Sequence, residues 1–506
     1  MTAIGRLLPA LARWRLLIAA AAGAATSFAF APCGLFPLAI AGPAILILLW
    51  EDATPRQAAR AGFLFGVALF GAGAWWIFTA VYEFGGTPIW LALFIMVVVL
   101  AIKGSYYLLL GWLVARASRL NRALRLLVLL PGAWLVMEWI RGWMFTGFPW
   151  LQLGYAHSDN WLIALAPVGG IHLVTLLTAI LAGALVLLLL GSARERVAAV
   201  VAAAVIWGAA FASRDGNWTA PAGEAMPIAL VQGAIPQDEK WLVEHRTTTL
   251  ERYHALNREA LGARIIVWPE SAIPVLAHEA EPFLDLIRRE GRAAGSDVMV
   301  GLLSFDFDTS EIRNGLYSMS ADGDGWYFKR RLVPFGEFFP VPAFVRKWMR
   351  LMSLPYYDMT PGAENQAPLN AGGQKLIATI CYEDAYGGDQ LGALATATLL
   401  VNATNNAWFG DSSAPHQQLQ MARFRAREAG RWLMRSTSNG ITAVIAPDGT
   451  IAARAPQFVP VVLKSTVQPR SGLTPYARVG NTPVLAIAFL MITIAMIANF
   501  WKRRGT

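Results

Sequence analysis

Long apolar runs constrain the fold of this chain more than any other feature. A helix needs about 20 apolar residues to cross the hydrocarbon core of a bilayer. Runs of that length, or nearly so, lie at about 15–31, 35–50, 61–81, 88–115, 124–141, 162–190, 197–213 and 483–501. The second is short and the seventh is rich in alanine. We therefore predict an α-helical transmembrane bundle of about eight spans.

Basic residues between the runs predict the topology, because Lys and Arg collect on cytoplasmic loops. They collect on alternate connections here, at Arg6, Arg13, Arg15, Arg56, Arg60, Arg116, Arg119, Arg122, Arg125, Arg194, Arg196, Lys502, Arg503 and Arg504. We expect both ends in the cytoplasm. The first run also resembles a signal peptide, but the membrane runs that follow favour an uncleaved anchor. The predicted domains are an N-terminal transmembrane domain of about seven spans (1–213), an extracytoplasmic domain (214–482) and a C-terminal span with a basic tail (483–506).

The net charge of +9 does not indicate a nucleic-acid partner. Residues 214–482 hold 26 Lys and Arg against 27 Asp and Glu, a net charge of −1, so the surplus belongs to the membrane part. Basic residues there set topology. Two cysteines and six histidines form neither a disulfide framework nor a zinc pattern, so we expect no metal.

The pattern changes between residues 214 and 482. Short β-branched runs read as buried strands at 226–233, 264–270, 297–303, 375–381 and 397–403. Polar, helix-favouring stretches lie between them at 239–261, 280–294 and 415–430. Alternation of this kind predicts a layered α/β domain with functional residues at strand ends.

Three reactive side chains lie at such strand ends or in the loops after them. Glu270 closes "IIVWPE", Lys329 lies in "GWYFKRR", and Cys381 closes "KLIATIC". A carboxylate can deprotonate a thiol, and a lysine can stabilise the thiolate and an oxyanion, which is the division of labour of acyl transfer. Each residue also has a simpler interpretation: a small core cysteine, a glutamate that caps a turn, and a lysine in a solvated basic run.

Four motifs in order extend this interpretation. "WPESAIP", "KRRLVPFGE", "ICYED" and "NATNNAWFGDS" resemble the nitrilase superfamily with its Glu-Lys-Cys triad. Together with the membrane runs and "TGFPWLQLGY" (146–155), they resemble the apolipoprotein N-acyltransferase family along essentially the whole chain. The resemblance implies a four-layer αββα sandwich attached to the membrane bundle, a monomer and no cofactor.

The resemblance also implies roles for individual residues. Glu270 matches the general base, Lys329 the catalytic lysine and Cys381 the nucleophile that forms a thioester. Glu337, Tyr382 and Glu383 match supporting positions, and loop aromatics that guard lipid entry match Trp241, Trp408 and Phe409. For these aromatics, ordinary core packing is the alternative. Asn406 stands where the family pattern leads us to expect Asp.

The implied reaction moves an acyl chain from the sn-1 position of a phospholipid, phosphatidylethanolamine in the first instance, to the α-amino group of a diacylglyceryl cysteine on an apolipoprotein. The implied location is the bacterial inner membrane, with the catalytic domain in the periplasm. One alternative is a membrane-tethered amidase that acts on a small substrate. Another is a transporter or receptor whose outer domain only binds a ligand, in which Cys381 is dispensable.

Several remaining features are open at this stage. The stretch 344–359 has the composition of an interfacial element, or of a helix packed on the α/β domain. Glu138 and Arg141 are spaced to pair along one helix or to contact a lipid headgroup. Lys103 has no assigned role, and Cys33 lies on the predicted outer side with Cys381, where a disulfide would consume the nucleophile.

Overall fold

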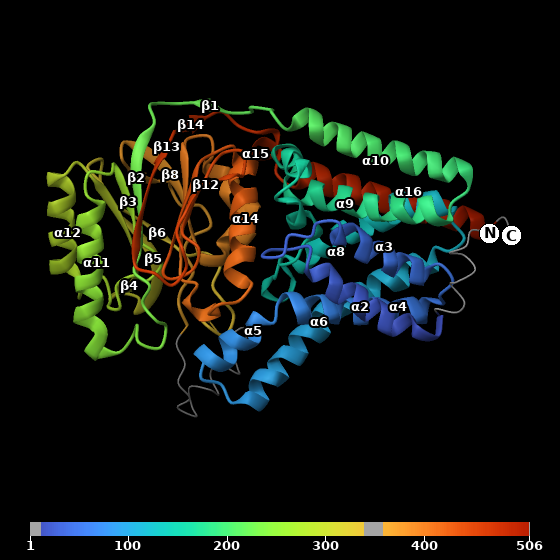
Figure 1. The fold of residues 1–506 in the computed structure, drawn as a ribbon, viewed down its shortest axis with the longest axis horizontal. Coiled ribbons are helices and arrows are strands. Elements are labelled where there is room, and N and C mark those ends of the chain that lie inside the picture. The colour runs from blue at the N-terminus through green and yellow to red at the C-terminus, as the bar shows by residue number, and fades with distance from the viewer. Residues whose placement is uncertain (1–11, 339–357, 505–506) are drawn as a thin grey trace. The chain divides into compact units, whose positions relative to one another are not determined.

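The computed structural model describes residues 12–338 and 358–504, which fall into two compact units (Figure 1). The first comprises Met1–Asn217, Asp411–Phe424 and Pro475–Thr506, and the second Trp218–Gly410 and Arg425–Thr474. Residues 411–424, inside the predicted range 214–482, thus group with the helical unit. The predicted interfacial stretch 344–359 lies outside the described residues, except for its last two positions.

The helical unit consists of long apolar helices joined by short turns. Its α-helices are α2 (Arg15–Ser27), α3 (Leu38–Trp50), α4 (Pro55–Gly73), α5 (Trp76–Thr79), α6 (Ile89–Arg116), α7 (Arg122–Leu124), α8 (Leu130–Arg141), α9 (Ala166–Leu190), α10 (Ala193–Ser213), α15 (Pro475–Val479) and α16 (Thr482–Arg504). The loop residue Thr54 begins α4 with a capping box, in which its side chain accepts from Gln57 N–H while the Gln57 side chain accepts from Thr54 N–H. Ser192 and Glu195 begin α10 in the same way.

The predicted count of about eight spans is not confirmed. Among the described residues, five helices are long and apolar enough to cross a membrane, and a bent pair at Pro55–Gly73 and Trp76–Phe84 makes up to six. The first two predicted spans fold as α2 and α3, of 13 residues each. Such a helix is only about 20 Å long. The apolar runs are longer than the helices because a turn containing Pro32, Gly34 and Pro37 separates the two.

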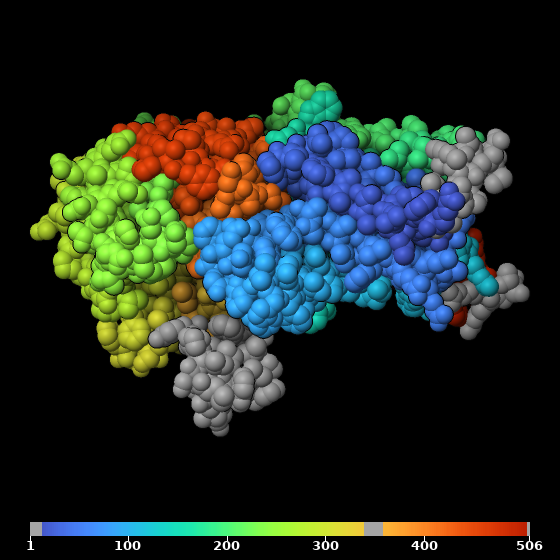
Figure 2. All heavy atoms as spheres, turned by 60° about the horizontal axis from the view of Figure 1, so that its bottom comes forward, coloured from blue at the N-terminus to red at the C-terminus, as the bar shows by residue number. Residues whose placement is uncertain are grey.

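Small residues let the helices of this unit approach one another closely. A Cβ on Gly62 of α4 would lie 2.2 Å from the carbonyl oxygen of Tyr107 on α6, and one on Gly23 of α2 would lie 2.1 Å from that of Phe65 on α4. Close backbone approach through glycine is the usual packing mode inside membranes. Large apolar side chains on α6, such as Trp90, remain exposed, and this helix forms part of the sky-blue surface in Figure 2. A membrane-spanning unit presents such a surface to lipid.

Charged side chains inside this unit are paired or lie over aromatic rings. Arg141 lies 3.8 Å from Glu138 on α8, and both are fully buried, so the predicted pair is present. The Glu138 carboxylate also accepts hydrogen bonds from Trp134 Nε1 and from the backbone N–H of Leu153. Lys103 Nζ lies 5.2 Å from the centre of the Phe148 ring, an attractive cation–π arrangement.

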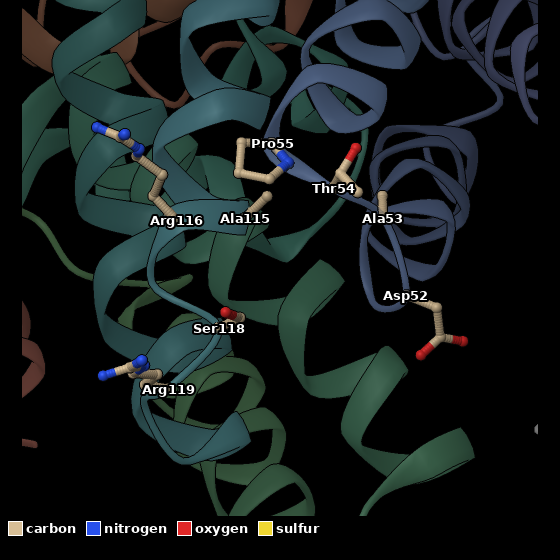
Figure 3. A pocket seen from close by; sticks show the side chains of 8 residues that line it. All are labelled: Asp52, Ala53, Thr54, Pro55, Ala115, Arg116, Ser118 and Arg119. Atoms are coloured by element: carbon tan, nitrogen blue, oxygen red, sulfur yellow. The ribbon is translucent and has the colours of Figure 1, made fainter. Parts of the chain in front are cut away.

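A cavity of about 630 Å³ opens between the α3–α4 turn and the end of α6. It is lined by Asp52, Ala53, Thr54, Pro55, Ala115, Arg116, Ser118 and Arg119. Figure 3 shows the side chains of Arg116 and Arg119 extending away from Thr54 and Asp52. None of the predicted catalytic residues lines this cavity.

The second unit contains two six-stranded mixed sheets. The first has the order β13-β2-β3-β4-β5-β6, with strands β2 (Met226–Gln232), β3 (Ile265–Val267), β4 (Asp297–Asp306), β5 (Glu311–Met319), β6 (Gly325–Phe328) and β13 (Val461–Val467). Strands β2, β3 and β4 are parallel, whereas β5 and β6 add antiparallel pairs. Because β5 is antiparallel to β4 and β6 is antiparallel to β5, β6 runs in the same direction as β3 and ends at the same edge of the sheet.

The second sheet has the order β12-β11-β10-β9-β8-β7. Its strands are β7 (Leu369–Ala371), β8 (Gln374–Ile380), β9 (Leu399–Thr404), β10 (Leu433–Thr437), β11 (Ala443–Ile445) and β12 (Ile451–Arg454). Strands β8, β9 and β10 are parallel, and the helix α14 (Ala414–Ala429) connects β9 to β10. A two-stranded pair of β1 (Ala220–Pro221) and β14 (Arg470–Ser471) completes the strands.

The two sheets share one apolar core. Side chains of β2, β3 and β4 pack against those of β8, β9 and β10 in a single buried cluster that includes Val267, Met299, Ile380, Val401 and Met434. The other face of the first sheet packs on α11 (Arg246–Ala260) and α12 (Glu281–Ala293), which lie beside it in Figure 1. The predicted α/β layering and all five predicted strands are therefore confirmed.

Candidate active site

Three predicted site residues follow strands that end at one edge of the double sheet. Glu270 lies three residues after β3, Lys329 directly after β6, and Cys381 directly after β8. The Lys329 N–H donates to the carbonyl oxygen of Asn314 on β5, which holds this side chain at the strand end. The carboxyl ends of parallel strands are where α/β folds carry their functional groups.

Lys329 forms a buried ion-pair network with two glutamates. Its Nζ donates to Glu270 Oε1 at 2.9 Å and to Glu337 Oε1 at 2.8 Å. The lysine side chain is only 1% exposed, so it is not part of a solvated basic run. Asn314 Nδ2 donates to the same two carboxylates, at 2.7 and 3.1 Å. The backbone N–H of Asn405 donates to Glu270 Oε2 at 2.8 Å. This network fixes the orientation of the Glu270 carboxylate.

Cys381 occupies a strained backbone position at the end of β8. Its φ is +55°, which L residues with a Cβ rarely adopt, and strain of this kind clusters at functional sites. The residue is buried, and its carbonyl oxygen accepts a hydrogen bond from Asn402 Nδ2 at 3.1 Å. Both Cys33 and Cys381 are free thiols, so no disulfide joins them.

The charges of the network act on the thiol and define its resting state. Burial and the negative charge of Glu270 raise the pKa of Cys381 to about 12, although Lys329 opposes them. Burial alone would raise the pKa of Glu270, but the charge and hydrogen bond of Lys329 hold it below its ordinary value. At neutral pH the site therefore holds a carboxylate, an ammonium and a neutral thiol. This is the arrangement in which a carboxylate takes a proton from a nucleophile during attack.

Glu383 and Tyr382 hold the loop of Lys329 against that of Cys381. Glu383 Oε1 accepts from the backbone N–H groups of Arg330 and Arg331, at 2.7 and 3.0 Å. Its Oε2 accepts from Ile380 N–H at 2.7 Å. The Tyr382 ring lies 5.9 Å from Lys329 Nζ, and its hydroxyl donates to the carbonyl oxygen of Leu332. These predicted supporting residues thus bond to the residue before Cys381 and to the residues after Lys329.

The predicted loop aromatics are at the surface of the second unit. Trp241 is 46% and Trp408 38% exposed, so neither is an ordinary core residue. Phe409 is half-buried in the short turn Ala407–Phe409. Asn406, where the family pattern led us to expect Asp, is buried against Gly440.

Sequence reasoning missed four residues that the structure brings to the site. They are Gln237, Lys240, Asn314 and Asn405. Gln237 Oε1 accepts from Asn405 Nδ2 at 3.0 Å, and Lys240 lies against the main chain of Glu270. Asn314 had no distinctive signal, since its strand also contains Glu311, Arg313 and Ser318. Asn405 lies within a quoted motif, but it acts through its backbone, which no side-chain pattern reveals.

The described residues offer no set of side chains suited to binding a metal ion. Among the residues that the structure describes, no three His, Cys, Asp or Glu side chains are grouped to hold a metal ion. The charge at the Glu270 site is instead balanced by the ammonium of Lys329.

The double sheet has the fold of an enzyme of the carbon–nitrogen hydrolase class, in a chain that also contains apolar helices long enough to cross a membrane. The family model "Carbon-nitrogen hydrolase" matches residues 227–476. The model "Apolipoprotein N-acyltransferase N-terminal domain" matches residues 22–184. The chain belongs to the apolipoprotein N-acyltransferase family and is an integral membrane enzyme.

Relatives with this family name match along nearly the whole chain. The apolipoprotein N-acyltransferase of Methylococcus capsulatus is 41% identical over 490 residues, which are 97% of this chain and 96% of the relative. That of Chromobacterium violaceum is 38% identical, over 97% of this chain and 95% of the relative. That of Pseudomonas putida is 37% identical, over 96% of each chain.

Solved structures match about half of this chain at low identity. A CN-hydrolase superfamily protein of Xanthomonas campestris is 17% identical, with a TM-score of 0.37, over 49% of this chain and 91% of that protein. An amidase of Nesterenkonia is 19% identical, with a TM-score of 0.36, over 51% and 95%.

Proposed function

We propose that this enzyme transfers an acyl chain from a membrane phospholipid, through a thioester on Cys381, to the α-amino group of an S-diacylglyceryl cysteine at the N-terminus of an apolipoprotein. The observation that carries the proposal is the Glu270 carboxylate, held as an anion by Lys329 and by Asn405 N–H near a buried thiol, in a chain of this family. The donor is phosphatidylethanolamine, and the ester cleaved is at sn-1.

The first half-reaction forms the thioester. The sulfur of Cys381 attacks the ester carbonyl carbon while Glu270 accepts the thiol proton. The resulting oxyanion is stabilised by the Lys329 ammonium and by backbone N–H groups. When the intermediate collapses, the carbon–oxygen ester bond breaks, and Glu270 returns the proton to the departing lysophospholipid oxygen. The acyl group is now bound to sulfur.

The second half-reaction transfers the acyl group to nitrogen. The neutral α-amine of the apolipoprotein attacks the thioester carbonyl and loses a proton to Glu270. The carbon–sulfur bond then breaks, and the proton passes to sulfur, which restores the neutral thiol and the carboxylate. Two substrates use one site in turn, so the kinetics are ping-pong.

A membrane-embedded enzyme suits two lipid-borne substrates. The donor resides in the bilayer, and the acceptor is anchored there by its own diacylglyceryl group. We place the range 214–482 on the periplasmic side of the bacterial inner membrane, between a transmembrane domain at 1–213 and a C-terminal span at 483–506. The alternation of basic residues between the spans supports this orientation. Exposed Trp241 and Trp408 on the catalytic unit suit contact with lipid.

Intact mass spectrometry after incubation with phosphatidylethanolamine alone tests the proposal. We expect a mass gain of one acyl chain that hydroxylamine removes and that Cys381→Ala abolishes. Cys33→Ala is the matched control, because it removes the other thiol and should leave the adduct unchanged. No adduct with any phospholipid would contradict the proposal. Release of free fatty acid to water, with no transfer to a diacylglyceryl peptide, would favour the amidase alternative.

A further inference from the structure

A second buried lysine lies beside the active-site glutamate. Lys240 precedes Trp241 in the loop between β2 and α11, and its side chain is only 3% exposed. Its Nζ donates to the carbonyl oxygen of Glu270 at 3.5 Å, which is the sole hydrogen bond of this ammonium within the described residues. An ammonium has three N–H donors. The geometry therefore leaves hydrogen-bonding capacity at a buried cation next to Glu270.

Such a cation is costly unless an anion accompanies it. Burial lowers the pKa of Lys240 to about 8, while the negative charge of Glu270 opposes this effect. The Glu270 carboxylate itself is already shared by Lys329, Asn314 and Asn405. The negative charge of Glu270 thus acts on Lys240, but both carboxylate oxygens already accept hydrogen bonds from other residues. A further anion at the site would accept hydrogen bonds from the Lys240 ammonium.

The residues that follow Lys240 form an exposed apolar tip. Trp241 is 46%, Leu242 44% and Val243 73% exposed. Three consecutive large apolar side chains in solvent are unusual and mark a lipid or partner contact. One loop therefore joins a buried cation to an apolar tip, an order that matches the charged and hydrocarbon parts of a phospholipid.

We propose that the ammonium of Lys240 binds the phosphate of the phospholipid acyl donor, while Trp241, Leu242 and Val243 contact its hydrocarbon part. This inference rests on the proposed function and adds how the enzyme recognises the class of its donor. Phosphate and the sn-1 ester are separated only by the glycerol backbone. A phosphate on Lys240, which touches the main chain of Glu270, therefore brings the ester close to the carboxylate.

The same loop is tied to the catalytic machinery. Gln237 Oε1 accepts from Asn405 Nδ2 at 3.0 Å, and Asn405 N–H donates to Glu270 Oε2. The Lys240 N–H donates to the carbonyl oxygen of Pro236, which closes the turn that holds both side chains. Phosphate binding at Lys240 thus orders a loop that supports the base, and Lys240 acts as a positioning residue.

The test compares two acyl donors on the full-length enzyme in detergent micelles. Phosphatidylethanolamine carries a phosphate, and p-nitrophenyl palmitate does not. The rate of Cys381 acylation without acceptor is followed by intact mass over a range of donor concentrations. For Lys240→Met we expect the half-saturating concentration of phosphatidylethanolamine to rise about 10- to 100-fold, because a hydrogen bond between a charged group and the phosphate is lost. Acylation by p-nitrophenyl palmitate should stay within about two-fold of wild type.

Lys240→Arg and Lys464→Met are the matched variants. The arginine keeps the charge and should recover most of the affinity for phosphatidylethanolamine. Lys464 is exposed on β13, so its replacement should leave the rate of acylation by either donor unchanged. The inference would be overturned if Lys240→Met slowed acylation equally for both donors, or if it slowed acylation for neither. If wild type forms no adduct with any phospholipid but reacts with the nitrophenyl ester, the proposed function fails instead.

Sodium phosphate distinguishes a lipid phosphate from a free one. If Lys240 recognises the donor, millimolar phosphate should compete weakly with phosphatidylethanolamine and leave the nitrophenyl reaction unchanged. Inhibition of the nitrophenyl reaction that disappears in Lys240→Met would indicate a site for free anions and would refute assignment to the donor.

Discussion

Replacing Glu270 by Gln should separate catalysis from the reactivity of the thiol. The substitution keeps the shape of the side chain but removes the negative charge that helps to raise the pKa of Cys381. It also removes the group that we propose accepts the thiol proton. Loss of a positioned general base costs about 10²- to 10⁴-fold in rate. We therefore expect acylation by phosphatidylethanolamine to fall by that factor.

Alkylation of the thiol by iodoacetamide should change in the opposite direction. With a pKa of about 12, roughly one thiol in 10⁴ is ionised at pH 8. Because only the thiolate reacts, each unit by which the pKa falls speeds alkylation about tenfold at that pH. Without the Glu270 carboxylate, burial and the Glu337 charge still raise the pKa of Cys381, but the largest charge that raises it is gone and the Lys329 ammonium still lowers it. We expect alkylation in the variant to be at least about tenfold faster.

The assay is intact mass over time between pH 7 and 10.5, in a Cys33→Ala background with one remaining thiol. Glu259→Gln, on the exposed face of α11, is the control and should change neither rate. Melting temperatures report whether the variant is folded, because a lost hydrogen bond to Asn405 costs about 1–3 kcal/mol. If alkylation slows together with acylation, Cys381 rests as a thiolate that Glu270 helps to maintain, and our reasoning about the resting state is wrong.

Three further substitutions test the supporting structure. Lys329→Met leaves the buried carboxylate of Glu270 and the partly buried one of Glu337 without their cation, and should destabilise the protein by about 3–5 kcal/mol in urea titration. Because the pKa of Glu270 lies below its ordinary 4.5, its pairing stabilises the wild type above pH 4.5 and is lost as the pH falls below that value; melting curves from pH 7 down to about pH 3 should show this acid-side loss in wild type but not in Lys329→Met. Glu383→Gln weakens the bonds to Arg330 and Arg331 N–H and should lower stability by about 1–3 kcal/mol, seen as a lower melting temperature. Gly301→Ala places a Cβ 2.2 Å from the Pro269 carbonyl oxygen, and should cost about 1–3 kcal/mol and slow acylation because Glu270 is displaced; unchanged melting and acylation would refute this account.

Local patterns of sequence were sufficient for the elements of this fold. Buried strands such as β3 and the Ile228–Val231 part of β2 are continuous apolar runs, because both of their faces are covered. Helices α11 and α12 follow from the polar stretches between strands. Apolar length alone overestimated the helices of the first two predicted spans, because the end of the run at 15–31 and the start of the run at 35–50 fold as turns and leave two helices of 13 residues each.

The three reactive residues were identifiable from strand ends and motif order, but their chemistry was not. Glu270 is 59 residues from Lys329 and 135 from Asn405, and the bonds between them exist only after the sheets have paired. The neutral thiol of Cys381 follows from burial beside a carboxylate, and the single hydrogen bond that the Lys240 ammonium donates within the described residues follows from burial beside the carbonyl of Glu270. Sequence by itself determines which residues are apolar, charged or nucleophilic and in what order they occur. Only the tertiary structure decides their protonation and their partners, because both depend on distance and solvent exclusion between residues far apart along the chain.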